Sequence, residues 1–274
     1  MNCTNRGLIA TQYLVVLHVV TAILEELAAN LVATTEIQWC DLMKSFPMVE
    51  QISSILFIIL YLPLLTVSLV PGITFIIWAI DWSESFPLLL RVTIMAFTVS
   101  STYFLHQAIL PLLCGILFRV LPIRYPLGKY RLHSWNGIRW AACTTLHRVA
   151  RQHFPMYSLP SWYVNLYYRL MGAKIEAGAH VATLLINDPQ HVTIGRGAVI
   201  GGGAIINSHS VEGEYLIVAE NIIGNKATIG LNSLLLAGAC VGNSATVGAR
   251  SVLLKHKSVP PEEKWVGTPA KKIG

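Results

Sequence analysis

Charged residues are scarce in this sequence. Only 12% of its 274 residues are Asp, Glu, Lys or Arg, and 54% are apolar, whereas about a quarter of the residues in a soluble domain are charged. The scarcity is uneven, because residues 8–120 hold few charges while residues 119–174 carry a dense basic set. The length leaves room for about two domains. The distribution excludes an ordinary soluble protein and divides the chain into a membrane part, a basic collar and a C-terminal part.

Metal-binding cysteine patterns are also lacking. None of the five cysteines forms a CxxC pair or another metal-ligand spacing, and nothing about them demands an oxidising compartment. Acidic residues are fewer than basic ones, which leaves a formal net charge of +6. The basic residues lie beside apolar segments, a position typical of positive-inside topology and of attraction to anionic lipid head groups. We therefore expect membrane lipids as partners and no nucleic acid.

Two apolar segments are long enough to span a bilayer, which takes roughly 20 apolar residues. The first covers residues 52–80 and contains Pro63 and Pro71, which a membrane helix tolerates where neighbouring groups bind the freed carbonyls. The second covers residues 87–121 and has an arginine near each end that can reach an interface. These segments predict an α-helical membrane domain over residues 1–121.

A third apolar segment, at about residues 8–33, is harder to interpret. It carries His18 and the acidic pair Glu25 and Glu26. The segment could span the membrane with its acids facing protein, lie at the interface, or be a signal peptide that ends near Ala33. The sequence therefore predicts two or three spans.

Residues 122–171 form the basic collar. Its positive excess follows the last predicted span, while the short link at residues 81–85 is acidic. The positive-inside rule then places the collar and everything after it on the cytoplasmic side. Within the collar, residues 135–153 put apolar side chains on one helical face and arginines and histidines on the other. Such a helix is typical of one lying on the membrane surface, or it could pack on the base of the C-terminal domain.

From residue 175 the chain counts in sixes. One position of the hexad is aliphatic, and a small side chain follows four residues later. The aliphatic residues are Ile194, Ile200, Ile206, Ile223, Ile229, Leu235, Val241, Val247 and Leu253. The small residues are Ala198, Ala204, Ser210, Ala227, Ser233, Ala239, Ala245 and Ser251. This pattern predicts a parallel β-helix, in which aliphatics fill a narrow interior, small residues fit the corners and each coil pairs with the next.

The coil text IGNKATIGLNSLLLAGACVGNSATVGARSVLLKHK, with the ending VGTPAK, resembles the hexapeptide-repeat acyltransferases, such as the maltose and galactoside acetyltransferases. The resemblance covers residues 172–274 and implies a left-handed parallel β-helix and a homotrimer with active sites between subunits. Spans, collar and coils together resemble the membrane-embedded C-terminal units of polylysine-synthetase-like peptide synthetases. Residues 187–195, NDPQHVTIG, add to that likeness.

The hexad phase breaks once, between Ile206 and Ile223, where seventeen residues stand in place of eighteen. A loop is expected to leave the prism there, with His209 at its root. The resemblance implies that His209 is the general base, a task that suits a side chain with a pKa near 6.5. Either Glu212 or Glu214 could orient its imidazole, although His209 could also be a plain turn residue.

The resemblance further implies an acyl-CoA donor, acetyl-CoA or a similar thioester, or else a phosphopantetheine-carried thioester. Small residues would leave backbone amides open to the pantetheine arm, and lysines would bind the phosphates. The expected residues are Gly238, Gly248, Ala249, Lys255, Lys271 and Lys272. The text Leu254-Lys255-His256 departs from the family's Thr-Lys-Asp and so loses a hydroxyl contact.

Two further interpretations concern single residues. His180, His191 and His209 could form a three-histidine zinc site, but their spacing differs from the closely paired histidines of the β-helical carbonic anhydrases, so no metal is expected. Asp188, which precedes Pro189, is expected to shape a turn.

The sequence thus predicts a mixed fold, with an α-helical membrane half and an all-β C-terminal domain. The expected function is a membrane-integrated acyltransferase that moves an acyl group from a thioester to a hydroxyl or amine of a small or lipid-linked acceptor. Alternatives are an amide-forming unit that uses a carrier-bound aminoacyl thioester and a non-catalytic trimeric membrane scaffold.

Overall fold

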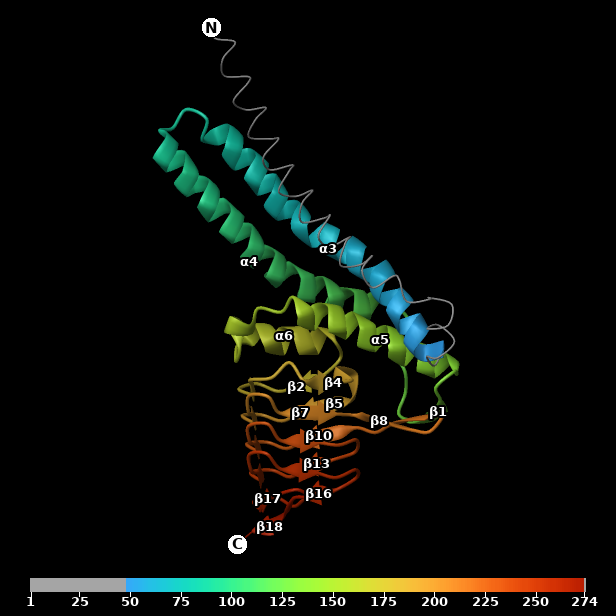
Figure 1. Ribbon diagram of the computed structural model, residues 1–274. Coiled ribbons are helices and arrows are strands. Elements are labelled where there is room, and N and C mark those ends of the chain that lie inside the picture. Colours follow the sequence, from blue (N-terminus) through green and yellow to red (C-terminus); the bar gives the residue numbers. More distant parts are fainter. Residues whose placement is uncertain (1–47, 274) are drawn as a thin grey trace. The chain divides into compact units, whose positions relative to one another are not determined.

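The structure, a computed structural model, describes residues 48–273. This part of the chain begins with two long apolar helices. Helix α3 covers Met48–Trp82 and helix α4 covers Leu88–Val120, close to the segments predicted from hydropathy. They lie side by side (Figure 1). Within them, Phe57–Trp82 and Leu88–Val120 are long and apolar enough to cross a membrane. The predicted segment 8–33 lies outside the described residues.

A glycine sets the distance between these two helices. A Cβ at Gly72 of α3 would overlap the Cγ2 of Thr102 on α4, and the Thr102 hydroxyl donates a 3.1 Å hydrogen bond to the Gly72 carbonyl. Small residues allow such close backbone approach between apolar helices. The outer faces stay apolar, because Ile58, Leu62 and Phe97 are among the large side chains left exposed there.

The collar folds into strand β1 (Gly128–Arg131), helix α5 (Trp135–Gln152), the short 3-10 helix η1 (Met156–Ser158) and helix α6 (Trp162–Leu170). Ser134 caps α5 by accepting from Gly137 N at 3.3 Å. The apolar face of α5, with Leu146 and Val149, is fully buried, and α5 contacts both α3 and α4. Of the two coverings expected for this face, the membrane surface and the C-terminal domain, neither is what the structure shows for Leu146 and Val149: other helices bury them.

Helix α6 covers the first coil of the β-helix. Two side chains of this helix, Tyr167 and Tyr168, are fully buried, and its Asn165 donates a 2.8 Å hydrogen bond to the carbonyl of Ala179. A stacked-coil domain needs its terminal hydrophobic surface covered, so α6 is the N-terminal cap.

The C-terminal domain has three parallel sheets whose strands follow one another around each coil (Figure 1). The first sheet contains β2 (Lys174–Ile175), β5 (Val192–Ile194), β10 (Asn221–Ile223), β13 (Cys240–Val241) and β16 (Ser258–Val259). The second contains β3 (His180–Val181), β6 (Val199–Ile200), β11 (Thr228–Ile229), β14 (Thr246–Val247) and β17 (Lys264–Val266), to which β18 (Lys271–Ile273) adds antiparallel. The third contains β4 (Ile186–Asn187), β7 (Ile205–Asn207), β12 (Leu234–Leu235) and β15 (Val252–Leu253).

The interior of this prism follows the predicted hexad. All the predicted aliphatic residues are buried, none more than 2% exposed, and the predicted small residues are buried beside them. Ser210 is the exception, because it lies in strand β8, outside the prism. The parallel β-helix is therefore as predicted, while its left-handed sense and the trimer stay implications of the resemblance.

The phase break is a β-hairpin, made of β8 (His209–Glu212) and β9 (Tyr215–Val218). Ile194 pairs with Ile223, 29 residues away, whereas Ile223 pairs with Val241, 18 residues away. The hairpin therefore adds 11 residues to one coil, so the break is an insertion and not the loss of one residue. Collar strand β1 pairs with β9 and completes a three-stranded antiparallel sheet.

Candidate functional site

Asp188 and His209 leave the prism at the same edge, one coil apart. Strands β4 and β7 are neighbours, with Asn187 opposite Asn207, and the amide of Asn187 donates a 2.8 Å hydrogen bond to that of Asn207. Asp188 directly follows β4, and His209 comes two residues after β7 ends. The stacking of these coils therefore brings together two side chains that are 21 residues apart in sequence.

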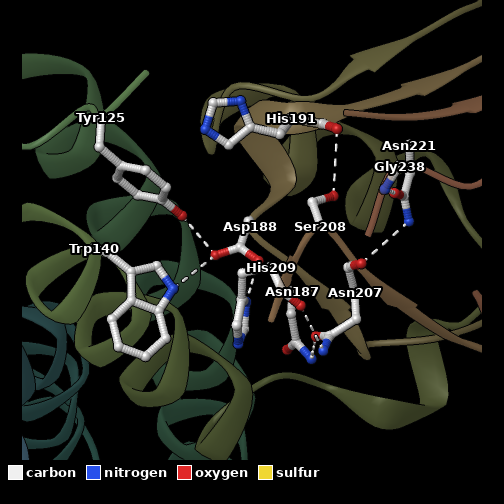
Figure 2. Close-up of polar contacts among 10 residues, drawn as sticks. All are labelled: Tyr125, Trp140, Asn187, Asp188, His191, Asn207, Ser208, His209, Asn221 and Gly238. Atoms are coloured by element: carbon white, nitrogen blue, oxygen red, sulfur yellow. Dashed lines mark hydrogen bonds and ion pairs between the residues drawn. The ribbon is translucent and has the colours of Figure 1, made fainter. Parts of the chain in front are cut away.

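The Asp188 carboxylate is held by three donors (Figure 2). Its Oδ1 accepts from the Tyr125 hydroxyl at 2.5 Å and from Trp140 Nε1 at 3.1 Å, and its Oδ2 accepts from His209 Nδ1 at 2.5 Å. The backbone of Asp188 is left-handed, at φ 58° and ψ 57°, a conformation that Asp and Asn tolerate. The carboxylate is thus fixed by its own turn and by two collar residues.

Electrostatics keep this carboxylate ionised. Burial alone would raise the pKa of Asp188, but the hydrogen bond and charge of His209 and the hydrogen bond of Tyr125 bring it below its usual value. Burial and the nearby Asp188 carboxylate raise the pKa of Tyr125 well above its usual value. Tyr125 therefore remains a hydrogen-bond donor to a charged acceptor.

The bond from Nδ1 to the carboxylate also fixes the tautomer of His209. With its proton on Nδ1, the neutral ring keeps a lone pair on Nε2. Nε2 makes no hydrogen bond to any residue in the described part of the chain, and the side chain is 18% exposed. Trp140 packs edge-on against the ring at 5.0 Å between centroids. The arrangement presents one oriented nitrogen that can take up a proton.

His209 and Asp188 open onto a cavity of about 670 Å³ between α5, the end of α4 and the first coils. It is lined by Phe118, Tyr125, Trp140, Cys143, Thr144, His147, Arg148, Arg151, Gln152, Met171, Asn187, Asp188, Pro189, Gln190 and His209. A cavity of this size can enclose a small molecule or the end of a longer one. The collar therefore supplies one wall of the site and the β-helix the other.

Further polar groups are hydrogen-bonded to one another beside His209, at the same edge of the prism (Figure 2). Asn221, which is fully buried, donates to the carbonyl of Asn207 at 3.3 Å and accepts from the amide of Gly238 at 2.8 Å. Gly238 has a φ of 77°, and a Cβ there would overlap the His256 ring. The amide of Gly238, expected to face a pantetheine arm, is thus already bonded to Asn221.

The acids expected to orient His209 do not contact it. Glu212 lies toward the tip of the hairpin, where Lys255 Nζ donates to its carboxylate, and that bond lowers the pKa of Glu212. Glu214 follows in the turn, and its carbonyl accepts from Leu132 N at 2.9 Å. The acid that contacts His209 Nδ1 is Asp188 and not Glu212 or Glu214. Asp188, which was expected to shape a turn, therefore also holds the imidazole.

The expected cofactor residues fall at different edges of one chain. Gly238 and Lys255 follow β12 and β15, on the edge of His209. Gly248 and Ala249 follow β14, at the next corner of the prism. Lys271 and Lys272 belong to β18, and Lys272 forms a 2.8 Å ion pair with Glu263. One chain therefore does not bring all of them to His209.

The three-histidine arrangement is not formed. His180 lies exposed in β3, and His191 stacks edge-on against Tyr125 at 5.1 Å between centroids. Among residues 48–273, no group of three His, Cys, Asp or Glu side chains is placed to hold a metal ion. The polar side-chain contact of His209 in the described part of the chain is with the carboxylate of Asp188.

Tyr125, Trp140 and the partnership of Asp188 with His209 were not predicted. One signal was present in the sequence, because Ile-Asn occurs at residues 186–187 and again at 206–207, just before Asp188 and His209. Reading these pairs as the same position in successive coils would have stacked the two side chains.

Comparison with known proteins places the chain near one curated sequence. No family model matches. The chain is 27% identical over 164 residues to the delta-poly-L-ornithine synthetase of Acinetobacter baumannii (strain AB307-0294), a match that covers 57% of this chain and 12% of that protein. The matched part thus spans about an eighth of the relative's length. The predicted resemblance to such peptide synthetases is confirmed.

Solved structures of hexapeptide-repeat enzymes are also similar. A hexapeptide-repeat acetyltransferase from Vibrio cholerae is 17% identical, with a TM-score of 0.36, over 54% of this chain and 94% of that one. A maltose O-acetyltransferase from Clostridium difficile 630 is 16% identical, also with a TM-score of 0.36, over 53% and 91%. Because both TM-scores are below 0.5, the assignment of the fold rests on the coils themselves.

Proposed function

We propose that this protein is a membrane-integrated acyltransferase in which His209 is the general base and Asp188 its orienting partner. The observation that carries the proposal is the 2.5 Å bond between Asp188 and His209 Nδ1 at the wall of a cavity of about 670 Å³. A nucleophile must lose a proton as it attacks a thioester, and an oriented imidazole at neutral pH is suited to take it.

The proposed proton path begins at the acceptor. Nε2 of His209 takes the proton of the acceptor hydroxyl or amine as that group attacks the thioester carbonyl. Asp188 stabilises the imidazolium that results without itself becoming protonated. The tetrahedral intermediate then expels the thiolate, and Nε2 returns the proton to the sulfur. One acyl–oxygen or acyl–nitrogen bond replaces one acyl–sulfur bond, and the base is regenerated.

The donor is a thioester, with acetyl-CoA or a similar acyl-CoA as the first form to test. Lys255, on the same edge as His209, and the sites predicted at Gly248, Ala249, Lys271 and Lys272 are the proposed donor contacts. Because Gly248 and Ala249 lie at another corner of the prism, they can serve His209 only across a subunit boundary. The proposal therefore includes the homotrimer that the resemblance implies.

A second candidate is an amide-forming unit that uses a carrier-bound aminoacyl thioester and an amine acceptor. The observation that favours it is the match to a protein named delta-poly-L-ornithine synthetase. The proton path is unchanged, because Nε2 would deprotonate the attacking amine. The two candidates differ in the donor, so they are separated by which thioester the protein consumes.

Membrane integration is proposed on α3 and α4. Both are long enough to cross a bilayer, and large apolar side chains cover their outer faces, where lipid would satisfy them. The positive collar that follows α4 supports a cytoplasmic side for the β-helix, by the positive-inside rule. Labelling of introduced surface cysteines from each side of sealed membranes tests this orientation; labelling of the β-helix from outside would contradict it.

The activity is tested with the purified full-length protein in lipid nanodiscs. Thiol release is followed with acetyl-CoA and, separately, with an ornithyl thioester of a phosphopantetheine carrier, each with ornithine as the amine acceptor. We expect His209→Ala to lower the rate about 10²- to 10⁴-fold. The control is His180→Ala, because His180 is an exposed histidine of the same domain.

Equal rates for the parent protein and His209→Ala would reject the base. Absence of transfer from either donor, together with normal function in cells of hairpin variants, would favour the non-catalytic scaffold.

A further inference from the structure

One face of α5 forms a continuous wall of the cavity. The α5 residues that line it are Trp140, Cys143, Thr144, His147, Arg148, Arg151 and Gln152. Their spacing of three and four residues puts them on one side of the helix. Trp140, near the start of this face, contacts both Asp188 and His209. The same face therefore extends from the reacting centre toward two arginines.

These two arginines have no counter-charge. Within the described part of the chain, the side chains of Arg148 and Arg151 make no hydrogen bond and no ion pair. Among the described residues, Asp188 is the one acid that lines the cavity, and both its oxygens are occupied by Tyr125, Trp140 and His209. Among the described residues, the cavity lining thus includes two arginines, of which Arg148 is exposed, and no carboxylate free to bind them.

The helix sets the separation between the arginines and the reacting centre. At 1.5 Å per residue, Arg148 follows Trp140 by about 12 Å and Arg151 by about 16 Å along the axis. Helical side chains lean toward the N-terminus of their helix. The guanidinium groups of the two arginines therefore come closer to Asp188 and His209 than their Cα atoms do, to roughly 10 Å. A ligand that reaches from His209 to the arginines must be elongated, with a length of about three extended residues.

We propose that Arg148 and Arg151 bind an oxyanion carried at the far end of an extended ligand whose other end reacts beside His209. A guanidinium fork binds phosphate and carboxylate through two parallel hydrogen bonds. Two sources offer this chemistry: the phosphate of a phosphopantetheine arm, and the C-terminal carboxylate of a short peptide acceptor. This inference rests on the proposed function, because it takes His209 as the reacting end.

Binding is measured by calorimetry on the full-length protein in nanodiscs, with 4′-phosphopantetheine and with ornithyl-ornithine as probes. Each probe is paired with its uncharged counterpart, pantetheine or the C-terminal amide. We expect the Arg148→Gln/Arg151→Gln double variant to bind the charged form of one pair about ten- to a hundredfold more weakly. The uncharged form of that pair should bind the parent and the variant alike.

The matched control is Arg139→Gln. Arg139 lies on the same helix but does not line the cavity, and its guanidinium packs over the Trp135 ring instead. The Arg148→Lys/Arg151→Lys variant keeps both charges without the planar fork, so it should bind the charged probe at an intermediate strength. Thermal unfolding of each variant excludes loss of the fold as the cause.

The pair that shows the charge-dependent loss identifies the source of the oxyanion, phosphate or carboxylate. Equal binding of both charged probes by the parent and the double variant would overturn the inference, as would an equal loss in Arg139→Gln. A failure of the proposed function is distinguishable: His209→Ala would then turn over like the parent, while binding of the charged probe still depended on the two arginines.

Discussion

Two histidine clusters in this molecule differ in what holds them. At the cavity, a carboxylate binds one nitrogen of His209 and leaves the other open. Between α3 and α4, Ser68 contacts His106 Nδ1 at 2.8 Å, and His106 Nε2 lies 3.1 Å from Nδ1 of His153. Tyr61 then closes the second cluster at 2.9 Å from His153 Nε2.

The second cluster uses every ring nitrogen. The Ser68 hydroxyl donates to the Leu65 carbonyl at 2.8 Å, so it accepts from His106, which accepts from His153, which accepts from Tyr61. None of these partners carries a negative charge, and none of the four side chains lines the described cavity. A histidine whose two nitrogens are both bonded links structural elements, whereas a carboxylate on one nitrogen and open space at the other suit His209 to the proposed role of base.

The largest effect that separates the clusters is expected from Asp188→Asn. Asn tolerates the left-handed backbone at this position and still accepts from Tyr125 and Trp140, but it cannot stabilise a His209 imidazolium. We expect acyl transfer to fall about 10²- to 10⁴-fold, with little change in thermal unfolding. The measurement is the rate of thiol release, with Asp81→Asn as the control, because Asp81 is an exposed acid in the last turn of α3. An unchanged rate would place the two clusters in the same structural class.

His147, a buried histidine of α5 whose hydrogen-bond partner is the Tyr167 hydroxyl, tests what burial does to a histidine. Burial, followed by the charge of Arg151, lowers the pKa of His147 to about 3, against about 6.5 in an unfolded chain. Above about pH 6.5 His147 is neutral in both the folded and the unfolded chain, so its protonation does not lower the free energy of unfolding. Below it the unfolded state binds the extra proton, so the free energy of unfolding falls by up to about 1.4 kcal/mol per pH unit.

In His147→Asn this contribution to the slope should vanish between about pH 6.5 and pH 3, while the control His133→Asn keeps it, because His133 is exposed. Chemical unfolding at a series of pH values measures the slope. A variant with the slope of the parent would show that His147 is not held neutral.

A smaller effect on stability, and none on chemistry, is expected from His106→Leu. The change removes the donor to the Ser68 oxygen and the acceptor for Nδ1 of His153, and an unpaired buried polar group costs about 1–3 kcal/mol. Thermal unfolding should shift downward, while the rate of acyl transfer stays within about twofold, since the proposed base is His209 and not His106. The comparison breaks if the rate of this variant falls as far as that of Asp188→Asn.

The smallest effect is expected from Glu212→Gln. Glu212 is exposed and bound to Lys255 at the hairpin, and exposed ion pairs contribute little to stability. Neither thermal unfolding nor the acyl-transfer rate should change measurably, because Asp188 holds the His209 ring. A loss of rate comparable to that of Asp188→Asn would restore Glu212 as an orienting acid.

Local patterns were enough to predict several elements. The apolar runs predicted α3 and α4 to within a few residues, because length and composition decide whether a helix can cross a bilayer. Strict spacing in sixes predicted the prism, since Ile194, Ile200 and Ile206 must all face one narrow interior. The partner of α5 could not be predicted for a related reason: an amphipathic face predicts burial, but not whether lipid or protein will cover it.

The sequence by itself determined the two apolar helices, the coils and the histidine at the phase break. Only the tertiary structure decided what holds that histidine. A period of six fixes which side chains face inward, whereas contacts between outward side chains depend on how coils of unequal length are stacked. The hairpin and the turn at Asp188 make those lengths unequal, and the collar then places Tyr125 and Trp140 on the carboxylate. The identity of the orienting acid therefore rests on long-range stacking that no local pattern contains.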